Sequence, residues 1–423
     1  MRAWAKHVRV KMMANRAGWM IYGANGYTGH LVAAEARRQG LYPVLAGRRA
    51  GPIETLAEDL GLPARVFDLG DARAAAAALA DMAVVSHCAG PFSATSAQMI
   101  DACLRSRTHY LDITGELDVF LAVQRRHADA QAAGIVICPG VGFDVIPTDC
   151  LAAVLKEALP DATHLVLAFD ARAHVSPGTA RTMAESFRLG RLGGRVRRNG
   201  VIEEVPLAHS RRRVDFAGDS AMTVAIPWGD LATAYVSTGI PNIETYAKIP
   251  PTAEIASRAL NWVRPLLAWA PVQKVLRRLA DRSTGPSDEE LRTGRARFWG
   301  KASNAAGAHR TARLETANGY RLTADGTIMA VKFVLDHASA GGYYTPSMLM
   351  GARCVEQLPG STPIRVESSL PGMPVTRPTG PARTSLAESP DDGVPRLEAA
   401  REPRRSRNIE DSNACFDWEE TRG

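Results

Sequence analysis

The stretch Gly23-Ala24-Asn25-Gly26-Tyr27-Thr28-Gly29 decides how the N-terminal part of this chain folds. It follows a short apolar run at residues 19–22 and precedes an amphipathic stretch at residues 28–38. Glycines between a strand and a helix allow a tight turn, let the backbone approach a pyrophosphate, and let the helix pack on the strand. The pyrophosphate then lies on the free amides and positive dipole end of the helix. The spacing is GxxGxxG rather than the common GxGxxG, so its position between strand and helix carries the prediction; the alternative is a turn that binds no nucleotide.

Around this turn, short apolar runs alternate with helical patterns, as a parallel sheet covered by helices requires. Strands are expected at residues 19–22, 42–46, 64–67, 82–86 and 135–138, with a short extended piece at Tyr110. Right-handed crossovers between them give an open, twisted sheet. We therefore predict an α/β fold in which residues 17–145 form a Rossmann-type NAD(P)-binding domain with a parallel sheet.

After Gly142 the pattern changes to strands joined by longer, irregular connections. The expected strands lie at residues 164–169, 201–206, 221–226, 232–237, 309–316 and 326–335. They predict that residues 146–360 form an α+β domain with a mixed sheet, which would hold a substrate or a partner.

The two ends of the chain differ from both predicted domains. Residues 1–16 are basic and are expected to be an extension, with an amphipathic targeting peptide as the alternative. Residues 361–423 are rich in Pro, Ser, Arg and Glu and poor in large apolar side chains. Such a composition cannot bury enough surface to offset the entropy of ordering, so we predict a disordered tail.

The end of the second strand indicates which nucleotide binds. NAD-specific sites usually have an acidic residue there, whereas this chain has Arg48 and Arg49 and no carboxylate before Glu54. Guanidinium groups form charge-assisted bonds to a 2′-phosphate that a carboxylate would repel. The sequence therefore favours NADP(H) over NAD(H); the alternative is that both arginines are merely solvated.

Two further loops lie where the third and fourth strands end, at the same edge of the sheet. Asp68 could reach the adenine, and the small, kinked run from Cys88 to Pro91 suits the nicotinamide ribose. His87 and Cys88 are better explained as packing residues than as catalytic ones. The predicted cofactor contacts are Gly23, Ala24, Asn25, Gly26, Tyr27, Thr28, Gly29, Arg48, Arg49, Asp68, Cys88, Ala89, Gly90 and Pro91.

Composition excludes several classes of protein. The chain has 423 residues, 46% hydrophobic and 22% charged, as soluble globular proteins have. The net charge of +7 is modest and gives no indication of nucleic-acid binding. There is no secretory signal and no run of roughly 18 apolar residues that could span a membrane. Six cysteines without CxxC spacing indicate a reduced, cytoplasmic protein, and no cluster of zinc ligands or YxxxK pair is found, so no metal is expected.

Two basic segments leave a partner open. Residues 256–279 are amphipathic and contain Trp262 and Trp269, which suits either surface helices over the sheet or a peripheral membrane contact. Eight arginines form the second segment, which is either a solvated hairpin or a dock for an acyl-carrier domain or a CoA-like phosphate. They are Arg188, Arg191, Arg195, Arg197, Arg198, Arg211, Arg212 and Arg213.

Several motifs together resemble the saccharopine dehydrogenase-like oxidoreductases. In the first half they are IYGANGYTGHLVA, LAGRR, CAGPF, YLDITGE and PGVGFDVIPTDC. In the second half they are SPGT, IPWGDLATAYVSTGIPNIETY, TGPSDEELRTGRARFWGKA and GGYYTP. The resemblance covers residues 17–358. It is closer to the branch with bacterial trans-acting enoyl reductases than to the lysine-pathway enzymes.

The resemblance implies a Rossmann domain, an α+β domain, and a C-terminal helix near residues 347–358 that returns to the first domain. It implies that Gly23, Gly26, Gly29 and Arg48 contact the cofactor, with Ala89, Gly90 and Pro91 near the nicotinamide. Asp112 and Glu116 match the YxDxxGE motif but receive no role from it.

The expected chemistry is hydride transfer, which also needs a donor for the developing charge. The candidate donors near the carboxyl edge are Tyr110, Asp144, His109 and Thr114. Of these, Tyr110 and Asp144 are the predicted catalytic residues. We predict an NADP-dependent oxidoreductase that reduces an unsaturated or keto acyl substrate, free or carrier-bound. The alternatives are a catalytically inactive nucleotide-binding scaffold or membrane-surface partner and, less favoured, a saccharopine-type amino-acid reductase.

Overall fold

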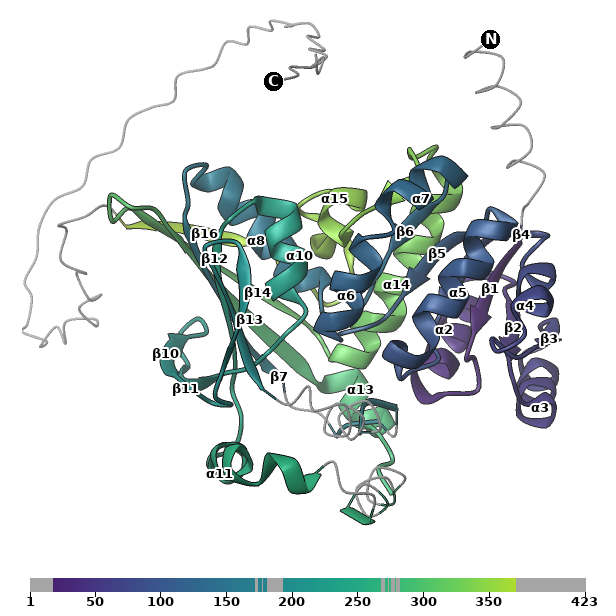
Figure 1. Cartoon of the computed structure of the whole chain (residues 1–423), viewed down its shortest axis with the longest axis horizontal. Coiled ribbons are helices and arrows are strands. Elements are labelled where there is room, and N and C mark those ends of the chain that lie inside the picture. The colour runs from purple at the N-terminus through teal and green to yellow at the C-terminus, as the bar shows by residue number, and fades with distance from the viewer. Residues whose placement is uncertain are drawn as a thin grey trace, which may run out of the picture. The chain divides into compact units, whose positions relative to one another are not determined.

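The computed structural model describes residues 18–369, apart from 172–173, 177, 181–192, 268–270, 273, 275–277 and 279–281. Within these residues a first sheet has the strand order β15-β6-β5-β4-β1-β2-β3, and every pairing is parallel (Figure 1). Its strands are β1 (Gly18–Tyr22), β2 (Val44–Gly47), β3 (Ala64–Val66), β4 (Met82–His87), β5 (His109–Asp112), β6 (Val136–Cys138) and β15 (Gly342–Tyr343). The predicted Rossmann-type parallel sheet is confirmed.

Helices cover both faces of this sheet. Side chains alternate along each strand, so Ile21 belongs to one core and Met20 to the other. One face is covered by α2 (Tyr27–Arg38), α3 (Ala50–Leu60) and α14 (Gly319–Asp336). The other is covered by α4 (Ala72–Ala78), α5 (Phe92–Ser106), α6 (Leu117–Gln124) and α7 (His127–Ala133). Burial on both faces explains why the central strands are continuous apolar runs.

A second sheet is built mainly from the chain after Ala162. Its principal strands follow the order β10-β11-β12-β7-β13-β14-β16, with β8 and β9 attached beside β12. Strand β7 is parallel to β12 and antiparallel to β13, so the predicted mixed sheet is confirmed. The bounds are β7 (His164–Ala171), β8 (Gly194–Arg198), β9 (Val201–Val205), β10 (Arg211–Asp215), β11 (Ser220–Ala225), β12 (Asn242–Ala247), β13 (Arg295–Ser303), β14 (His309–Ala317) and β16 (Arg365–Ser369).

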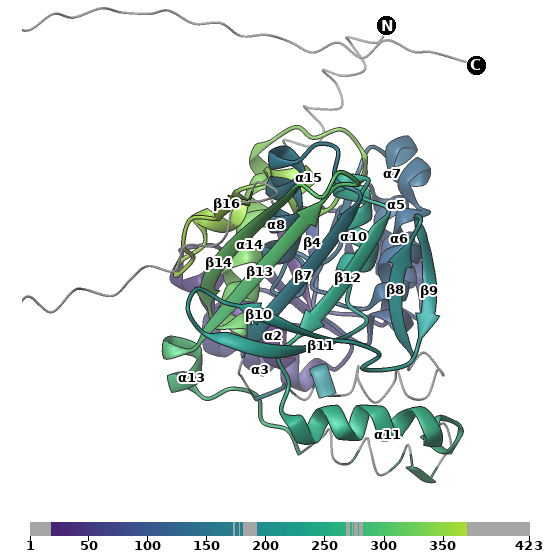
Figure 2. The same ribbon diagram turned by 90° about the vertical axis from the view of Figure 1, so that its left-hand side faces the viewer.

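Two helices pack on the inner face of the second sheet. They are α8 (Ile146–Ala158) and α10 (Asp230–Thr238), which bury Leu151 and Leu231 against the strands. Gly300 of β13 makes the approach possible, because a Cβ there would lie 2.7 Å from Leu155 Cδ1. Four further elements complete the description: α11 (Pro251–Leu267), α13 (Asp288–Thr293), α15 (Pro346–Met350) and the 3₁₀ turn η1 (Cys354–Gln357). Figure 2 shows the second sheet face-on, with α11 lying lengthwise below its strands.

Two predicted strands are wrong. Residues 232–237 lie in α10 and residues 326–335 lie in α14. Both helices are buried on several sides, so their apolar positions form nearly continuous runs that periodicity cannot distinguish from strands. Six strands had no counterpart in the prediction: β8, β10, β12, β13, β15 and β16. In β13 apolar residues alternate with arginine and lysine, which is a strand pattern that the prediction overlooked, and the residues on its inner side are buried.

The two chain ends differ in what the structure describes. Strand β16 lies inside the tail predicted to be disordered, yet it pairs with β14 from Arg365 to Ser369. The remainder, 370–423, and the basic extension 1–16 lie outside the described residues. The expected returning helix at 347–358 consists of α15 and η1, while the long helix that packs on α2 is α14.

Candidate active site

The glycine-rich turn between β1 and α2 forms a cradle at the carboxyl edge of the first sheet. Gly23 has a φ of +84°, and a Cβ there would lie 2.8 Å from the Ala89 nitrogen. A Cβ at Gly29 would lie 2.9 Å from Ala24 Cα. The N-cap of α2 is Gly26, which has no side chain, so no side chain satisfies the amides of the first turn. This end of α2 therefore offers backbone donors and a positive dipole to an anion.

Arg48 and Arg49 follow β2 at the same edge, and both are exposed. Among the described residues neither guanidinium has an ion pair or a side-chain hydrogen bond, so both can reach a ligand. Asp68 follows β3, but its Oδ1 accepts a 2.7 Å hydrogen bond from the Gly70 nitrogen. The turn and the two arginines thus fit a pyrophosphate and a 2′-phosphate, while Asp68 holds its own loop.

The loop from Cys88 to Pro91 lies beside the glycine-rich turn. The Cys88 nitrogen donates to the Tyr22 oxygen at 2.8 Å, and the Gly90–Pro91 peptide is cis. Burial raises the pKa of the Cys88 thiol to about 12, so it is not a nucleophile near neutral pH. His87 is fully buried, with Nε2 3.0 Å from Thr95 Oγ1, and burial lowers its pKa to about 3. Both residues pack the sheet rather than exchange protons.

Tyr110, one of the two candidate donors, lies in the hydrophobic core. It is fully buried, and its hydroxyl donates to Asp112 Oδ2 at 2.6 Å. Asp112 Oδ1 accepts from the nitrogens of Thr114 at 2.9 Å and Gly140 at 3.0 Å, which ties the loops after β5 and β6 together. His109 likewise accepts from the Val136 nitrogen at 2.8 Å. Tyr110 is therefore a scaffold residue without access to a substrate.

Glu116 has a role that the sequence did not assign. Its carboxylate accepts hydrogen bonds from the nitrogens of Phe92 at 2.7 Å and Ser93 at 3.0 Å, the first two residues of α5. The residue before α5 is Pro91, which has no side-chain acceptor, so a distant residue supplies the cap. The proline at the N-cap position was the only feature of the sequence to indicate that the first amides of α5 need an acceptor from another part of the chain.

Asp144, the other candidate donor, lies in the loop after β6. It is half-buried, and loss of solvent around its carboxyl raises its pKa to about 7. Within the described residues its carboxylate has no hydrogen bond. Gly115, in the loop after β5, lies against this carboxyl. Asp144 is thus placed where the loops of two neighbouring strands meet, with a carboxyl able to hold a proton near neutral pH.

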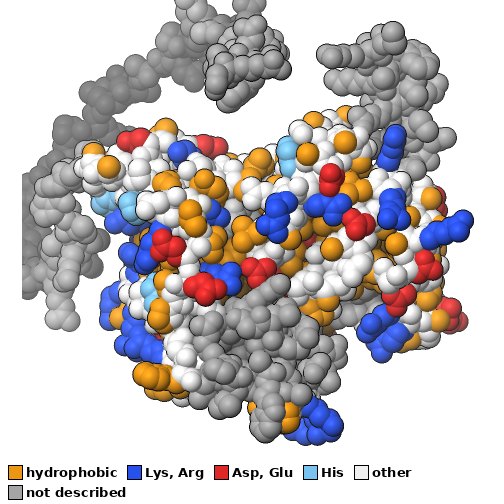
Figure 3. All heavy atoms as spheres, viewed as in Figure 1, with side chains coloured by type: hydrophobic (Ala, Val, Ile, Leu, Met, Phe, Trp, Pro, Cys, Tyr) orange, Lys and Arg blue, Asp and Glu red, His pale blue; other side chains and the backbone are white. Residues whose placement is uncertain are grey.

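Aromatic side chains of the second sheet hold the Asp144 loop. Phe143 lies 5.4 Å from Phe298 and 5.9 Å from Phe169, measured between ring centroids. Trp228 lies 5.0 Å from Phe169, and its Nε1 donates to the Asp144 backbone oxygen at 2.8 Å. Figure 3 shows hydrophobic side chains gathered across the middle of the face where α6 and α14 meet the second sheet. Aromatic side chains therefore hold the Asp144 loop, while the buried carboxyl of Asp230 lies close enough to interact electrostatically with that of Asp144.

Comparison with known proteins agrees with this geometry. Residues 19–138 match the saccharopine dehydrogenase NADP-binding domain. The trans-acting enoyl reductase of Mycobacterium tuberculosis is 26% identical over 402 residues, covering 81% of this chain and 95% of that protein. Residues 19–138 are therefore a saccharopine dehydrogenase NADP-binding domain, and the chain is similar along most of its length to an oxidoreductase.

Two further relatives of this family extend the comparison. The human saccharopine dehydrogenase-like oxidoreductase is 30% identical over 150 residues, which is 31% of this chain and 35% of that protein. The structure of apo saccharopine dehydrogenase (L-Glu forming) from Saccharomyces cerevisiae matches with a TM-score of 0.57 at 14% identity, covering 84% of this chain and all of that one. The second likeness shows the fold alone.

Residues of the second half also reach the nucleotide loop. The Tyr27 hydroxyl donates to the Pro286 oxygen at 2.8 Å, and its ring lies 5.2 Å from that of Tyr320. The Ser176 nitrogen in turn donates to the Tyr320 hydroxyl at 2.7 Å. Tyr320 and Pro286 were missed by the sequence analysis because only the folded chain brings them beside Tyr27.

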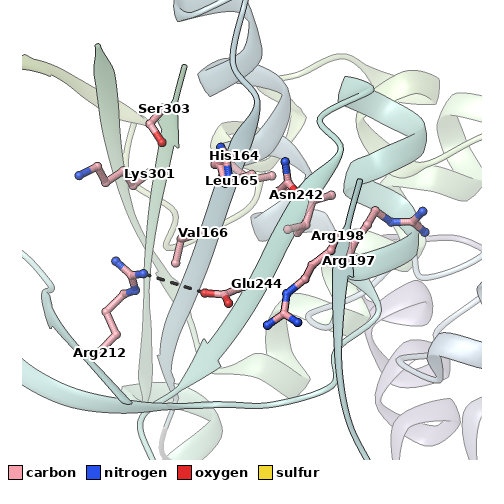
Figure 4. Close-up of a pocket in the computed structure, with 11 residues that line it drawn as sticks. His164, Leu165, Val166, Arg197, Arg198, Arg212, Asn242, Glu244, Lys301 and Ser303 are labelled. Carbon is pink, nitrogen blue, oxygen red and sulfur yellow. Dashed lines mark ion pairs between the residues drawn. The ribbon is translucent and has the colours of Figure 1, made fainter. Parts of the chain in front are cut away.

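A separate pocket lies on the second sheet (Figure 4). Its volume is about 420 Å³, and it is lined by His164, Leu165, Val166, Arg197, Arg198, Arg212, Asn242, Ile243, Glu244, Lys301 and Ser303. None of these residues belongs to the first sheet, so the pocket is no part of the nucleotide site. Arg212 pairs with Glu244 across 4.0 Å, and Arg197 donates to the Leu231 oxygen at 2.6 Å.

The predicted basic segment is only partly described. Arg188 and Arg191 lie outside the described residues, Arg195 pairs with Asp118 and Glu204, and Arg198 pairs with Glu203. A dock for an acyl carrier or a CoA-like phosphate stays a prediction. Across the described part of the chain, no group of His, Cys, Asp and Glu is arranged to hold a metal ion, and no helix is long and apolar enough to cross a membrane.

Proposed function

We propose that this chain is an NADP(H)-dependent reductase of an unsaturated or keto acyl substrate, in which Asp144 donates the proton. One observation carries the proposal: the Asp144 carboxyl lies at the carboxyl edge of the nucleotide-binding sheet, beside an aromatic cluster, and loss of solvent raises its pKa to about 7. Groups with such a pKa work best as general acids near neutral pH. NADP(H) in place of NAD(H) is supported by Arg48, Arg49 and the matching domain.

The chain's residues fit this cofactor in position and chemistry. The glycine-rich turn and the N-terminus of α2 would hold the pyrophosphate, and Arg48 and Arg49 the 2′-phosphate. The loop from Ala89 to Pro91 follows β4, the neighbour of β1, and would lie under the nicotinamide. When bound, NADPH supplies a hydride. The remaining chemistry falls to the protein, which must orient the substrate, exclude water and supply one proton.

Asp144 would supply that proton. Reduction would leave an electron pair on the α-carbon of an enoyl group or on the oxygen of a ketone. The carboxyl of Asp144 then gives its proton to that atom, and solvent restores it. A substrate gains one hydride and one proton, so the step is balanced.

The surroundings of Asp144 support an acyl substrate over an amino acid. Phe143, Phe169 and Trp228 are all half-buried around its loop, and such surfaces favour apolar groups. Saccharopine-type chemistry needs cationic side chains for several carboxylates, and none of the described contacts of Asp144 is cationic. The extended match to a trans-acting enoyl reductase supports reduction of a carbon–carbon double bond.

The test is NADPH oxidation by the purified full chain with a panel of enoyl and 3-ketoacyl thioesters. We expect turnover with at least one of them, and a kcat reduced by about 10²- to 10⁴-fold in Asp144→Asn. The dissociation constant of NADPH, measured by calorimetry, should not change. Asp118→Asn, a carboxyl on α6 paired with Arg195, is the matched control and should keep its activity. Tight NADPH binding without turnover on any substrate would favour the non-catalytic alternative.

A further inference from the structure

Helix α11 attaches to the rest of the molecule through polar side chains. The Asn261 amide accepts from the Leu207 nitrogen at 2.9 Å and donates to the Leu207 oxygen at 3.1 Å. Glu254 is only 7% exposed and pairs with Arg211 and with Arg258. The polar face of α11 therefore faces the protein.

The neighbouring face of α11, about 100° further around the helix, is apolar and exposed. Ile255 is 66% exposed and Trp262 is 88% exposed. Together with the exposed Ala259 they are spaced i, i+4 and i+7, so they form one stripe along the helix. Ordinary surface helices bury their apolar stripe and expose the polar one. In α11 this arrangement is reversed, which indicates that an apolar environment lies outside the molecule.

Charge indicates what that environment is. Arg258 lies beside the stripe and is 48% exposed, and Lys274, Arg278 and Arg282 are exposed in the chain that follows. None of the exposed residues described in α11 is acidic. Exposed tryptophan, an isoleucine and flanking cations are the composition of helices that lie in the headgroup region of anionic bilayers. We propose that α11 docks this protein on an anionic lipid surface, with Ile255 and Trp262 inserted between the headgroups.

The segment after α11 leads to the nucleotide site. Gly285 packs against the Tyr27 ring, where a Cβ would lie 2.7 Å from Tyr27 Cε2, and Pro286 accepts the Tyr27 hydrogen bond. Docking through α11 would thus hold the nucleotide loop near the lipid surface. The docking itself does not depend on the proposed reaction, because it follows from the exposure and charge of α11 alone.

The test is flotation of the full chain with vesicles of phosphatidylcholine, with and without phosphatidylglycerol. We expect binding to the anionic vesicles that weakens with added salt, because surface charges are screened. The double variant Ile255→Ser with Trp262→Ser should bind about tenfold or more weakly. Tyr42→Ser with Val201→Ser is the matched control, since these side chains are 64% and 63% exposed elsewhere, and it should bind like the wild type. NADPH binding and thermal unfolding show that each variant is folded.

Three outcomes would overturn the proposal. The first is a full chain that does not float with anionic vesicles. The second is equal binding by the Ile255/Trp262 variant and its control. The third is a wild type that self-associates in sedimentation experiments through these residues but ignores vesicles, since the stripe would then be an interface between copies of the chain.

Discussion

Gly115 lies directly against Asp144. A Cβ at position 115 would lie 2.9 Å from Asp144 Cγ, a distance that side chains do not tolerate. The glycine comes from the loop after β5 and the carboxylate from the loop after β6, so the proposed proton donor lies where these two loops meet and leaves no room for a side chain at position 115. The YxDxxGE motif therefore supplies two acids, Asp112 and Glu116, and also a glycine, Gly115, that leaves room for the Asp144 carboxyl.

Gly115→Ala should displace the Asp144 carboxyl and reduce kcat. A misplaced catalytic group commonly costs on the order of 10²-fold in rate. We expect the dissociation constant of NADPH to stay the same, because position 115 is not in the nucleotide turn. Gly51→Ala in α3 is the control, since a Cβ there has nothing within 4 Å. Steady-state kinetics and calorimetry separate the two effects, and an unchanged kcat in Gly115→Ala would show that the position of Asp144 next to Gly115 does not matter for turnover.

The activity should depend on pH through Asp144. Burial raises its pKa from 3.8 to about 7, so the carboxyl is protonated below that pH and ionised above it. Only the protonated form can donate, so kcat should be level at lower pH and fall about tenfold per pH unit above about pH 8. A kcat that is constant from about pH 6 to 9 would contradict this role.

The same shift predicts a change in stability. Because the folded-state pKa is above the unfolded one, the buried carboxyl favours unfolding as pH rises from 3.8 to about 7. The asparagine side chain of Asp144→Asn cannot ionise, so this variant does not lose stability in this way. The difference between its free energy of unfolding and that of the wild type should therefore become more favourable to the variant as pH rises. Urea denaturation at both ends of the range measures the difference.

Replacing Arg48 and Arg49 together with alanine should weaken NADPH binding selectively. Charge-assisted hydrogen bonds to a phosphate contribute about 1.5–3 kcal/mol, and NADH has no 2′-phosphate to lose them. Calorimetry with both nucleotides measures the difference. Arg73→Ala with Arg105→Ala, two exposed arginines on α4 and α5, controls for the change in net charge. Equal losses for NADPH and NADH would show that the arginines do not recognise the 2′-phosphate.

Removing the Glu116 carboxylate should destabilise the protein through α5. Loss of a helix cap costs about 1–2 kcal/mol, and here two amides lose their acceptor. Glu116→Ala should lower the free energy of unfolding by this amount in urea, and Glu116→Gln by less, because one oxygen remains. Glu157→Ala, an exposed residue of α8, should have little effect. A Glu116→Ala variant as stable as the wild type would show that solvent replaces the cap.

Local patterns predicted the nucleotide turn because every residue of β1, the turn and α2 lies within 21 positions. Long-range contacts were not predictable in this way. Nothing near Phe92 shows that its amide binds Glu116, and nothing near Tyr27 shows that Pro286 and Tyr320 surround it. Helix α14 was taken for a strand because its buried face is too wide for a helical period to show. Asp144 was recognised as a candidate from its position after a strand, but the aromatic side chains beside it come from the second sheet.

The pairing of strand β15 with β6 affects how the chain folds during synthesis. Val136 of β6 pairs with Gly342, roughly 200 residues later in the chain. During synthesis β6 emerges from the ribosome long before its partner, so it remains an open edge, the kind of surface on which strands from other chains add. We expect a fragment that stops near residue 145 to aggregate rather than fold, so the nucleotide site is a property of the finished chain.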